Sequence, residues 1–331
     1  MKKSPLMQRT LQATWRAALG AVLACSATFA LAQYPTKPIT MVVPFPPGGV
    51  ADTVGRPVAE AMSRHLKQSI VVENKGGAGG GIGMAQVAKS KADGYTVLMS
   101  LSSLVVLPEA DKILQRPPMF QVNQLKAIAR FTADPTVLVV RSESPWKTYA
   151  EFMAYVKSNP GKISFGSSGN YGTMHVPMEQ LKAATSTFML HVPYTGAGPA
   201  VMALLGGQIE ALSTGPASVK QHLASGRLRA LAHWGEGRLP GMPEVPSFKE
   251  LGLPIQYSQW SGMFVPADTP TAVVDSLRQA AKFAAQDPRA VAALTASGTS
   301  FMYQDATDFE RFVQNDAKAM SALVARIGKV D

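Results

Sequence analysis

The sequence predicts an α/β fold of two lobes, each built on a mostly parallel sheet flanked by helices. Short apolar runs alternate with longer amphipathic segments from residue 39 to 99, and the same rhythm restarts at residue 136. No low-complexity linker separates the two stretches, which favours lobes joined by strands that cross between them. We therefore expect residues 33–134 and 233–331 to form lobe 1, and residues 135–232 to form lobe 2.

The first stretch has a βαβαβ pattern. Its apolar runs Ile39–Val43, Ile70–Glu73 and Tyr95–Met99 are typical of buried strands. A Pro/Gly turn precedes the amphipathic segment Ala51–Leu66, which predicts a helix. A glycine-rich loop leads into a second helix near Gly83–Ser90.

The second stretch predicts five more strands and three helices. The strands are expected at Thr136–Val140, Ile163–Phe165, Phe188–Val192, Ile209–Leu212 and Leu228–Ala232. The helices are expected at Tyr149–Ser158, ending at Asn159-Pro160-Gly161, and at Thr173–Ala184 and Ala200–Leu205. The region from Thr271 onward is mostly helical, and Asp268-Thr269-Pro270 is a good helix start.

The first 32 residues are typical of a secretory signal peptide. Lys2, Lys3, Arg9 and Arg16 form a basic start, followed by an apolar stretch of 13 residues from Ala17 to Phe29. Ala30-Leu31-Ala32 offers small residues for cleavage after Ala32. A membrane-spanning helix would need ~20 apolar residues. We therefore expect a periplasmic protein whose mature chain begins at Gln33.

Cys25 is the only cysteine, and it lies inside this signal. Lipidation there is a minor alternative, because Leu23 stands where lipoprotein signals usually have a small residue. Cleavage after Ala32 leaves 299 residues without a cysteine, so core packing alone must hold the fold. Removing four basic residues lowers the net charge from +10 to +6. The charge is spread out, without the basic patch and interleaved aromatics of a nucleic-acid-binding protein.

Residues just after the strands are the best binding candidates, because ligands of open α/β sheets sit beyond the carboxyl ends of the strands. The first strand is followed by Pro44–Asp52, in which two glycines open a helix. Glycine amides and a helix N-terminus form a site suited to a carboxylate. Asp52 either contacts the ligand or caps the helix.

Three similar loops follow strands of the second stretch. They are Gly166–Thr173 (GSSGNYGT), Pro193–Pro199 (PYTGAGP) and Ser213–Pro216 (STGP). Their small residues leave space, and serine, threonine and asparagine form hydrogen bonds without carrying charge. Each loop alone is an ordinary turn, but four such loops divided between two lobes favour a cleft that binds an anion.

Enzyme, metal and cofactor patterns are absent from the sequence. Gly76–Gly83 contains no G-x-G-x-x-G, there is no P-loop, and Gly166–Asn170 lacks the last glycine of G-x-S-x-G. The five histidines, His65, His175, His191, His222 and His233, show no metal-ligand spacing. His175 could line the cleft, although a structural role is the more common one. We expect no catalytic residue, no metal and no cofactor.

Eight stretches of the chain, in order, resemble the Bug-type family, the extracytoplasmic receptors of tripartite tricarboxylate transporters. They are Val43–Arg56, Val72–Gly83, Ala92–Leu98, Gly161–His175, His191–Gly207, Leu228–Ala232, Pro243–Gly252 and Trp260–Pro270. The resemblance covers essentially the whole mature chain. It implies a flytrap fold of the periplasmic-binding-protein type, similar to type II, that closes on a small carboxylate.

The resemblance also implies the ligand-binding residues. They are Gly48, Gly49 and Asp52 in lobe 1, and Ser167, Ser168, Gly169, Thr173, Tyr194, Thr195 and Gly196 in lobe 2. The loops that follow the strands add Pro47, Asn170, Ser213 and Thr214 as candidates. Many members carry Asp or Asn where Ser213-Thr214-Gly215 stands here, which leaves the choice of ligand open.

The implied partners are membrane subunits of a transporter, reached by a monomeric receptor. A sensor that signals to a membrane kinase, or an enzyme on a similar fold, are the alternatives.

Overall fold

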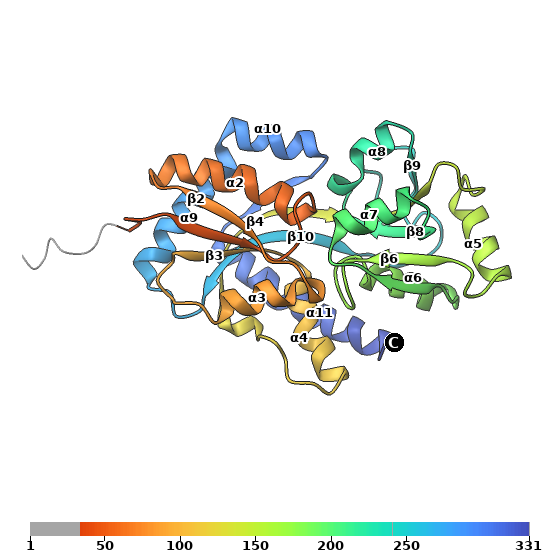
Figure 1. Ribbon diagram of the computed structural model, residues 1–331, viewed down its shortest axis with the longest axis horizontal. Helices are drawn as coiled ribbons and strands as arrows, with labels where there is room; N and C mark the ends of the chain where they lie inside the picture. Colours follow the sequence, from red (N-terminus) through yellow and green to blue (C-terminus); the bar gives the residue numbers. More distant parts are fainter. Residues whose placement is uncertain (1–33, 240, 331) are drawn as a thin grey trace, which may run out of the picture. The chain divides into compact units, whose positions relative to one another are not determined.

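The structure, a computed structural model, describes residues 34–239 and 241–330. The chain from Lys37 to Asp331 forms one compact unit (Figure 1). The predicted signal peptide of residues 1–32, with Cys25 and the cleavage site after Ala32, lies outside the described residues. None of the helices within the described ranges combines the length and apolar character that a membrane span requires.

The first sheet has six strands in the order β11-β4-β10-β3-β1-β2. They span Ile39–Val43 (β1), Ile70–Asn74 (β2), Thr96–Leu101 (β3), Leu125–Pro135 (β4), Ser258–Pro266 (β10) and Phe301–Gln304 (β11). Strands β2 and β3 both pair in parallel with β1, and β10 pairs antiparallel with β3 and β4. Four strands therefore run one way, while β10 and β11 run the other way.

Helices cover this sheet on both faces. They are Val50–Leu66 (α2), Gly81–Ala88 (α3), Ser103–Ile113 (α4), Thr271–Gln286 (α9), Pro288–Ser297 (α10) and Ala306–Ile327 (α11). Helix α2 packs against α9 and α10, and α4 packs against α11. Figure 1 shows α2 and α10 on one side of the sheet, with α3, α4 and α11 on the other. The C-terminal helices thus pack against the first sheet and its helices.

The second sheet has five strands in the order β7-β6-β8-β5-β9. They span Val137–Arg141 (β5), Ser164–Ser167 (β6), Leu190–Pro193 (β7), Ala211–Thr214 (β8) and Leu228–His233 (β9). Its helices are Tyr149–Ser158 (α5), Val176–Thr185 (α6), Ala197–Leu205 (α7) and Lys220–Ala224 (α8). Only β5 runs against the other strands, because it is antiparallel to both β8 and β9. Both sheets are therefore mixed, with most strands in one direction.

The main chain crosses between the sheets at Thr136, the single residue between β4 and β5. It returns between His233 and Ser258, where β10 begins. His233, which we assigned to the first lobe, is the last residue of a strand in the second sheet. Direct entry from β4 into β5 explains why β5 opposes its neighbours, since no helix intervenes to reverse the chain.

Most predicted elements form close to their expected bounds, but the sequence analysis missed β4, β10, β11, α4 and α8. Strand β4 was not predicted because polar residues recur along it, including Arg130, Thr132 and Asp134. All three are buried, since helices or neighbouring strands cover both faces. Helix α6 begins at Val176 and not at Thr173, because residues 168–175 form a loop in which Tyr171 has a positive φ of 56°.

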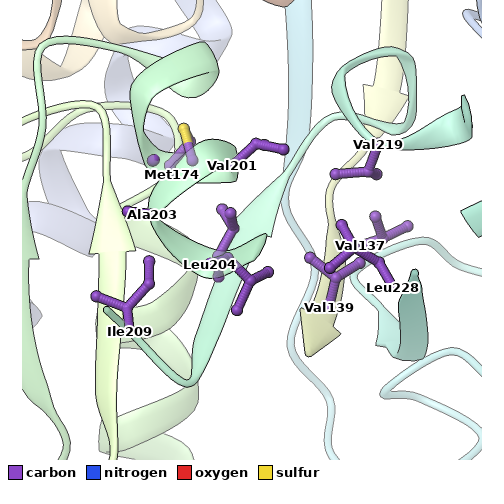
Figure 2. Packing of buried hydrophobic residues seen from close by; sticks show 11 residues of the cluster. Val137, Val139, Met174, Val201, Ala203, Leu204, Ile209, Val219 and Leu228 are labelled. Atoms are coloured by element: carbon purple, nitrogen blue, oxygen red, sulfur yellow. The ribbon is translucent and has the colours of Figure 1, made fainter. Parts of the chain in front are cut away.

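An apolar cluster joins α7 to the middle of the second sheet. Figure 2 shows Leu204 of α7 between Ile209 and Val139 of β5, with Val201 beside it. Each of these side chains is at most 4% exposed. Burial of one such side chain contributes about 2 kcal/mol. The cluster fixes α7, and hence the loop that precedes it, against the ends of β6 and β8.

Asp134, near the end of β4, titrates abnormally. Burial raises its pKa to about 6, although the Ser300 amide donates a hydrogen bond of 2.6 Å that acts in the opposite direction. In the unfolded chain the same carboxyl has a pKa of ~3.9. The folded state therefore keeps the proton to higher pH, and its stability falls as the pH rises from about 4 to about 6.

We predict that Asp134→Asn removes this loss of folding stability with rising pH. The variant should gain about 2 kcal/mol over the parent between pH 4 and pH 7.5, because the amide has no charge to desolvate. Denaturant unfolding of both proteins at the two pH values measures the difference. A difference that does not change with pH would contradict the assignment of the titration to Asp134.

Candidate ligand-binding site

Two loops of the second sheet meet at one edge. Strands β6 and β8 pair in parallel, with Phe165 opposite Ala211 and Gly166 opposite Leu212. Ser167-Ser168 and Ser213-Thr214 are the next residues on each strand, so the register brings these four hydroxyl groups to the same edge of the sheet. All four side chains are at most 2% exposed. The sequence analysis singled out these residues, and the structure places them side by side.

Ser168, Ser213 and Thr214 share an unusual property. The hydroxyl oxygen of each is fully buried and has no hydrogen-bond partner within the described residues. A buried polar group left unpaired costs about 1–3 kcal/mol, so such groups are usually paired. Three of them at one edge form a set of neutral donors that is suited to binding a polar group.

Ser167 has a different role, because its hydroxyl is already used. It lies 2.6 Å from Nε2 of His191, and it accepts a hydrogen bond of 3.0 Å from the Gly169 amide. Burial, together with the nearby His175, lowers the pKa of His191 to about 3, so the ring is neutral and shares a hydrogen bond with Ser167 whose direction depends on the tautomer. These contacts, together with the one to the Gly169 carbonyl at 3.2 Å, hold the loop in shape.

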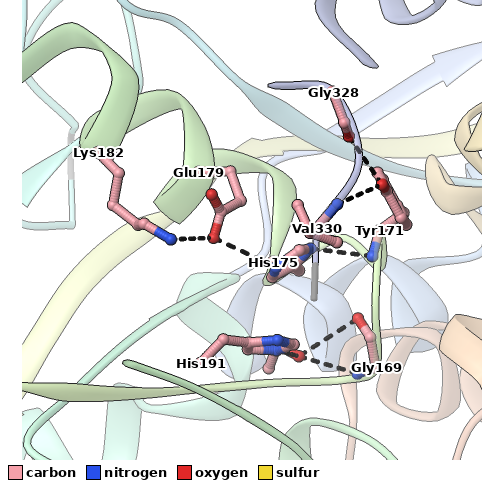
Figure 3. Close-up of polar contacts among 9 residues, drawn as sticks. Gly169, Tyr171, His175, Glu179, Lys182, His191, Gly328 and Val330 are labelled. Carbon is pink, nitrogen blue, oxygen red and sulfur yellow. Dashed lines mark hydrogen bonds and ion pairs between the residues drawn. The ribbon is translucent and has the colours of Figure 1, made fainter. Parts of the chain in front are cut away.

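A second histidine, His175, also supports this loop. Nδ1 of His175 accepts a hydrogen bond of 2.9 Å from the Tyr171 amide, and Nε2 lies 3.4 Å from Glu179. Burial would raise the pKa of Glu179, but hydrogen bonds from His175 and Lys182 outweigh it and keep the pKa below its ordinary value. Figure 3 shows Lys182, Glu179, His175 and Tyr171 in a row joined by these contacts. His175 is fully buried, which fits the structural role.

The C-terminal tail holds the loop from another direction. The Tyr171 hydroxyl donates to the carbonyl of Gly328 at 2.8 Å and accepts from the amide of Val330 at 3.0 Å (Figure 3). Tyr171 itself is fully buried. The tail follows α11, which packs on the first sheet. The tail therefore links the first sheet to the loop that follows β6 in the second sheet.

Asp52 organises the loop that follows β1. Its carboxylate accepts hydrogen bonds from the Gly48 amide at 3.0 Å, from Arg56 at 2.8 and 3.0 Å, and from Asn74 at 2.9 Å. Burial would raise the pKa of Asp52, but these bonds outweigh it and lower the pKa. Asp52 is not the N-cap of α2, which is Gly49, and its carboxylate is instead committed to the preceding loop, to Arg56 and to Asn74. The amide of Gly48 is also engaged and is not available to a ligand.

Both glycines that follow β1 have room for a Cβ atom. Gly49 has an extended backbone with φ −80°, and the positive φ of 80° belongs to Gly48. A Cβ on Gly49 would lie 3.6 Å from the Pro46 carbonyl and 3.9 Å from Cβ of Ala197, which are ordinary contacts. Space alone therefore does not require glycine at position 49.

Some glycines with little or no room for a Cβ atom lie where loops of the two sheets meet. A Cβ on Gly196 would overlap the Pro46 ring, and one on Gly169 would lie 2.8 Å from the Gly79 amide nitrogen. A Cβ on Gly198 would lie 3.4 Å from the carbonyl of Pro47. Pro46, Pro47 and Gly79 follow β1 and β2, whereas the other three residues follow β6 and β7. Loops from the two sheets are thus in backbone contact.

Two polar residues of the first sheet belong to this region, and the sequence analysis missed both. Gln259 of β10 donates a hydrogen bond of 3.0 Å from Nε2 to the Thr173 hydroxyl, while its Oε1 is buried without a partner. The Ser103 hydroxyl, at the start of α4, is also buried and unpaired. Ser103 follows β3, so it could have been found by searching for polar residues just after each strand, as was done for the other strands. Gln259 lies at the start of the antiparallel strand β10, so a search of the residues that follow strands does not identify it.

The remaining predicted residues face an outer pocket of about 570 Å³. It is lined by Gly169, Asn170, Tyr194 and Thr195 from the second sheet, and by Ala78 and Arg116 from the first. The predicted site therefore divides into a buried edge of hydroxyl groups and a more open polar pocket, with Gly169 next to both.

The contact between Ser167 and His191 has the distance of a nucleophile and its base. Ser167 is fully buried and bound to its own loop, so this geometry does not present it to a substrate. Within residues 34–239 and 241–330, no group of three or more His, Cys, Asp or Glu residues could hold a metal ion.

Comparison with known proteins agrees with this architecture. Residues 54–329 match the family model described as the tripartite tricarboxylate transporter family receptor. A UPF0065 protein from the tcbD-tcbE intergenic region of Pseudomonas sp. strain P51 is 36% identical over 290 residues, which covers 86% of this chain and 85% of that protein.

Solved structures give the same result. The periplasmic binding protein BugD matches with a TM-score of 0.84 at 30% identity, covering 89% of this chain and 98% of that one. MatC of Rhodopseudomonas palustris, solved with bound malate, matches with a TM-score of 0.81 at 27% identity, covering 88% and 99%. A further R. palustris protein, solved with adipate, has a TM-score of 0.83 at 26% identity, covering 89% and 98%.

The two-sheet fold and these matches confirm the resemblance found in the sequence, and the relatives are receptors and binding proteins. The chain belongs to the family of tripartite tricarboxylate transporter receptors.

Proposed function

We propose that this receptor binds a small carboxylate between two lobes, one built on each sheet and divided near residues 135 and 233, and delivers it to membrane subunits of a transporter. The observation that carries the proposal is the set of buried, unpaired hydroxyls of Ser168, Ser213 and Thr214 at the edge where the two sheets meet. Structural neighbours with bound malate and adipate support a carboxylate as the ligand.

Neutral donors suit a receptor that must release its ligand. An ion pair buried without water carries a large desolvation cost, and breaking it is slow and expensive. Several hydroxyls and amides spread the negative charge of a carboxylate over many weaker bonds. The ligand then forms hydrogen bonds with groups of both lobes, which stabilises the closed form of the protein relative to an open form.

The binding event involves no chemical step. Ser167 and His191 are committed to the shape of the loop, and the hydroxyls that remain have no base beside them in the described contacts. A carboxylate should be recovered unchanged after long incubation with the protein. A thermal-shift screen against di- and tricarboxylates, amino acids and aromatic acids tests binding. Ligand at 100 times its dissociation constant should stabilise the protein by about 2.7 kcal/mol.

We predict that Ser168→Ala lowers affinity for the acid found in this screen about tenfold. It removes one hydrogen bond to a charged partner, worth about 1.5–3 kcal/mol, and leaves the shape of the site unchanged. Calorimetry measures the change, with Ser225→Ala, an exposed serine after α8, as the control. If Ser168→Ala binds as the parent does, the carboxylate lies elsewhere.

Gly196→Ala should prevent the two lobes from closing on the ligand. Its Cβ would overlap Pro46 of the first sheet, whereas an open form would accommodate it. The backbone of Gly196 is extended, so alanine causes no local strain. We expect affinity to fall at least tenfold with little change in the stability of the ligand-free protein.

Gly49→Ala is the matched control, because its Cβ makes only ordinary contacts across the same boundary. Small-angle scattering with and without ligand reports closure directly. Equal compaction of Gly196→Ala and the parent would show that the two sheets approach differently.

Export of the receptor rests on residues 1–32. We expect the mature protein to begin at Gln33, to carry no lipid and to be a monomer in the periplasm. Intact-mass measurement of the periplasmic fraction, followed by light scattering, tests all three. Retention of residues 1–32, or a lipid on Cys25, would overturn the proposed processing.

A further inference from the structure

Arg116 is a cation held in a fixed orientation beside the candidate site. It lies in the loop after α4, where its amide donates to the Asp111 carbonyl at 3.0 Å. Its side-chain Nε donates to Oδ1 of Asp111 at 2.6 Å. Asp111 is itself buried, and its second oxygen accepts from the Met119 amide at 3.2 Å. The guanidinium is therefore anchored through Nε.

The other two nitrogens of this guanidinium have no partner in the described part of the chain. About half of the side chain is exposed, and it lines the outer pocket. No other Lys, Arg, Asp, Glu or His side chain lines that pocket. Lys112, the nearest cation before it in the sequence, is paired with Glu109 at 2.6 Å. The pocket therefore has one oriented and uncommitted positive charge.

Neutral hydrogen-bonding groups surround this charge. Asn170, Tyr194 and Thr195 face the same pocket from the second sheet. Gly169, which also lines it, directly follows Ser168 of the buried edge. A ligand whose first carboxylate reaches the Ser168 hydroxyl could thus extend past Gly169 into the outer pocket. An anionic group at its far end would meet the open side of the Arg116 guanidinium, a geometry that favours two parallel hydrogen bonds.

We propose that Arg116 is a specificity-determining residue that binds the second acid group of an extended dicarboxylate, with Asp111 as its positioning residue. The inference rests on the proposed function and adds the substrate class: dicarboxylates long enough to span both regions are preferred over monocarboxylates of equal length.

The test compares adipate with hexanoate, which has the same chain length but only one acid group. Calorimetry is performed on the purified parent protein, Arg116→Gln and Lys112→Gln. Lys112→Gln removes one positive charge from the same segment without changing the pocket, so it controls for the general field of the protein. We expect Arg116→Gln to weaken adipate binding about tenfold and to change hexanoate binding less than twofold. Lys112→Gln should leave both affinities nearly unchanged.

The ionic strength gives an independent readout. Added salt should weaken adipate binding to the parent more than to Arg116→Gln, because half-exposed charges are screened. Adipate binding by Arg116→Gln that equals the parent's would overturn this inference and leave the proposed function intact. An equal loss for adipate and hexanoate would also overturn it, since Arg116 would then act on the shape of the site. If the parent binds neither acid nor any other carboxylate, the proposed function fails, and this inference fails with it.

Discussion

Contact between two backbones is the constraint on which the rest of this structure depends. Loops from the first sheet touch loops from the second so closely that Gly169 and Gly196 have no space for a side chain. Close approach of this kind removes water from between the loops and encloses the polar groups behind them. The hydroxyls of Ser168, Ser213 and Thr214 are buried behind these loops, where Ser168 follows β6 and the other two residues end β8.

Burial of these groups is tolerable because other groups hold the loops rigid. Asp52 accepts four hydrogen bonds that tie Gly48 of the loop after β1 to Arg56 of α2 and Asn74 of β2, and Ser167 with His191 shapes the loop after β6. In both loops, a side chain that resembled a ligand contact in the sequence serves as a brace. A loop fixed beforehand loses little conformational entropy when a ligand arrives, so more of the interaction energy appears as affinity.

Electrostatics divides the site into two regions. The buried edge presents neutral donors, which avoid the desolvation cost of an enclosed cation. The outer pocket contains Arg116, whose charge stays half in water and therefore costs little to maintain there. Among the described residues that line the outer pocket, Arg116 alone is charged. Its position at the open end would attract an anionic solute and orient it, while the first acid group of the solute reaches uncharged partners inside.

The sequence by itself determined the alternation of strands and helices, and it identified loops at Pro44–Asp52, Gly166–Thr173 and Ser213–Pro216, because periodicity and glycine-rich turns are local properties. It could not show that Asp52 and Ser167 are engaged, since their partners Asn74 and His191 lie more than twenty residues away. Tertiary structure alone decided that Gly196, and not Gly49, is the glycine without space. It alone also brought Gln259 and Arg116 to the site, because β10 returns to the first sheet beside β3 and α4 starts at the end of that same strand. Residues adjacent along the chain reveal a loop, whereas the hydrogen bonds and contacts that assign each residue its role come from segments that only folding brings together.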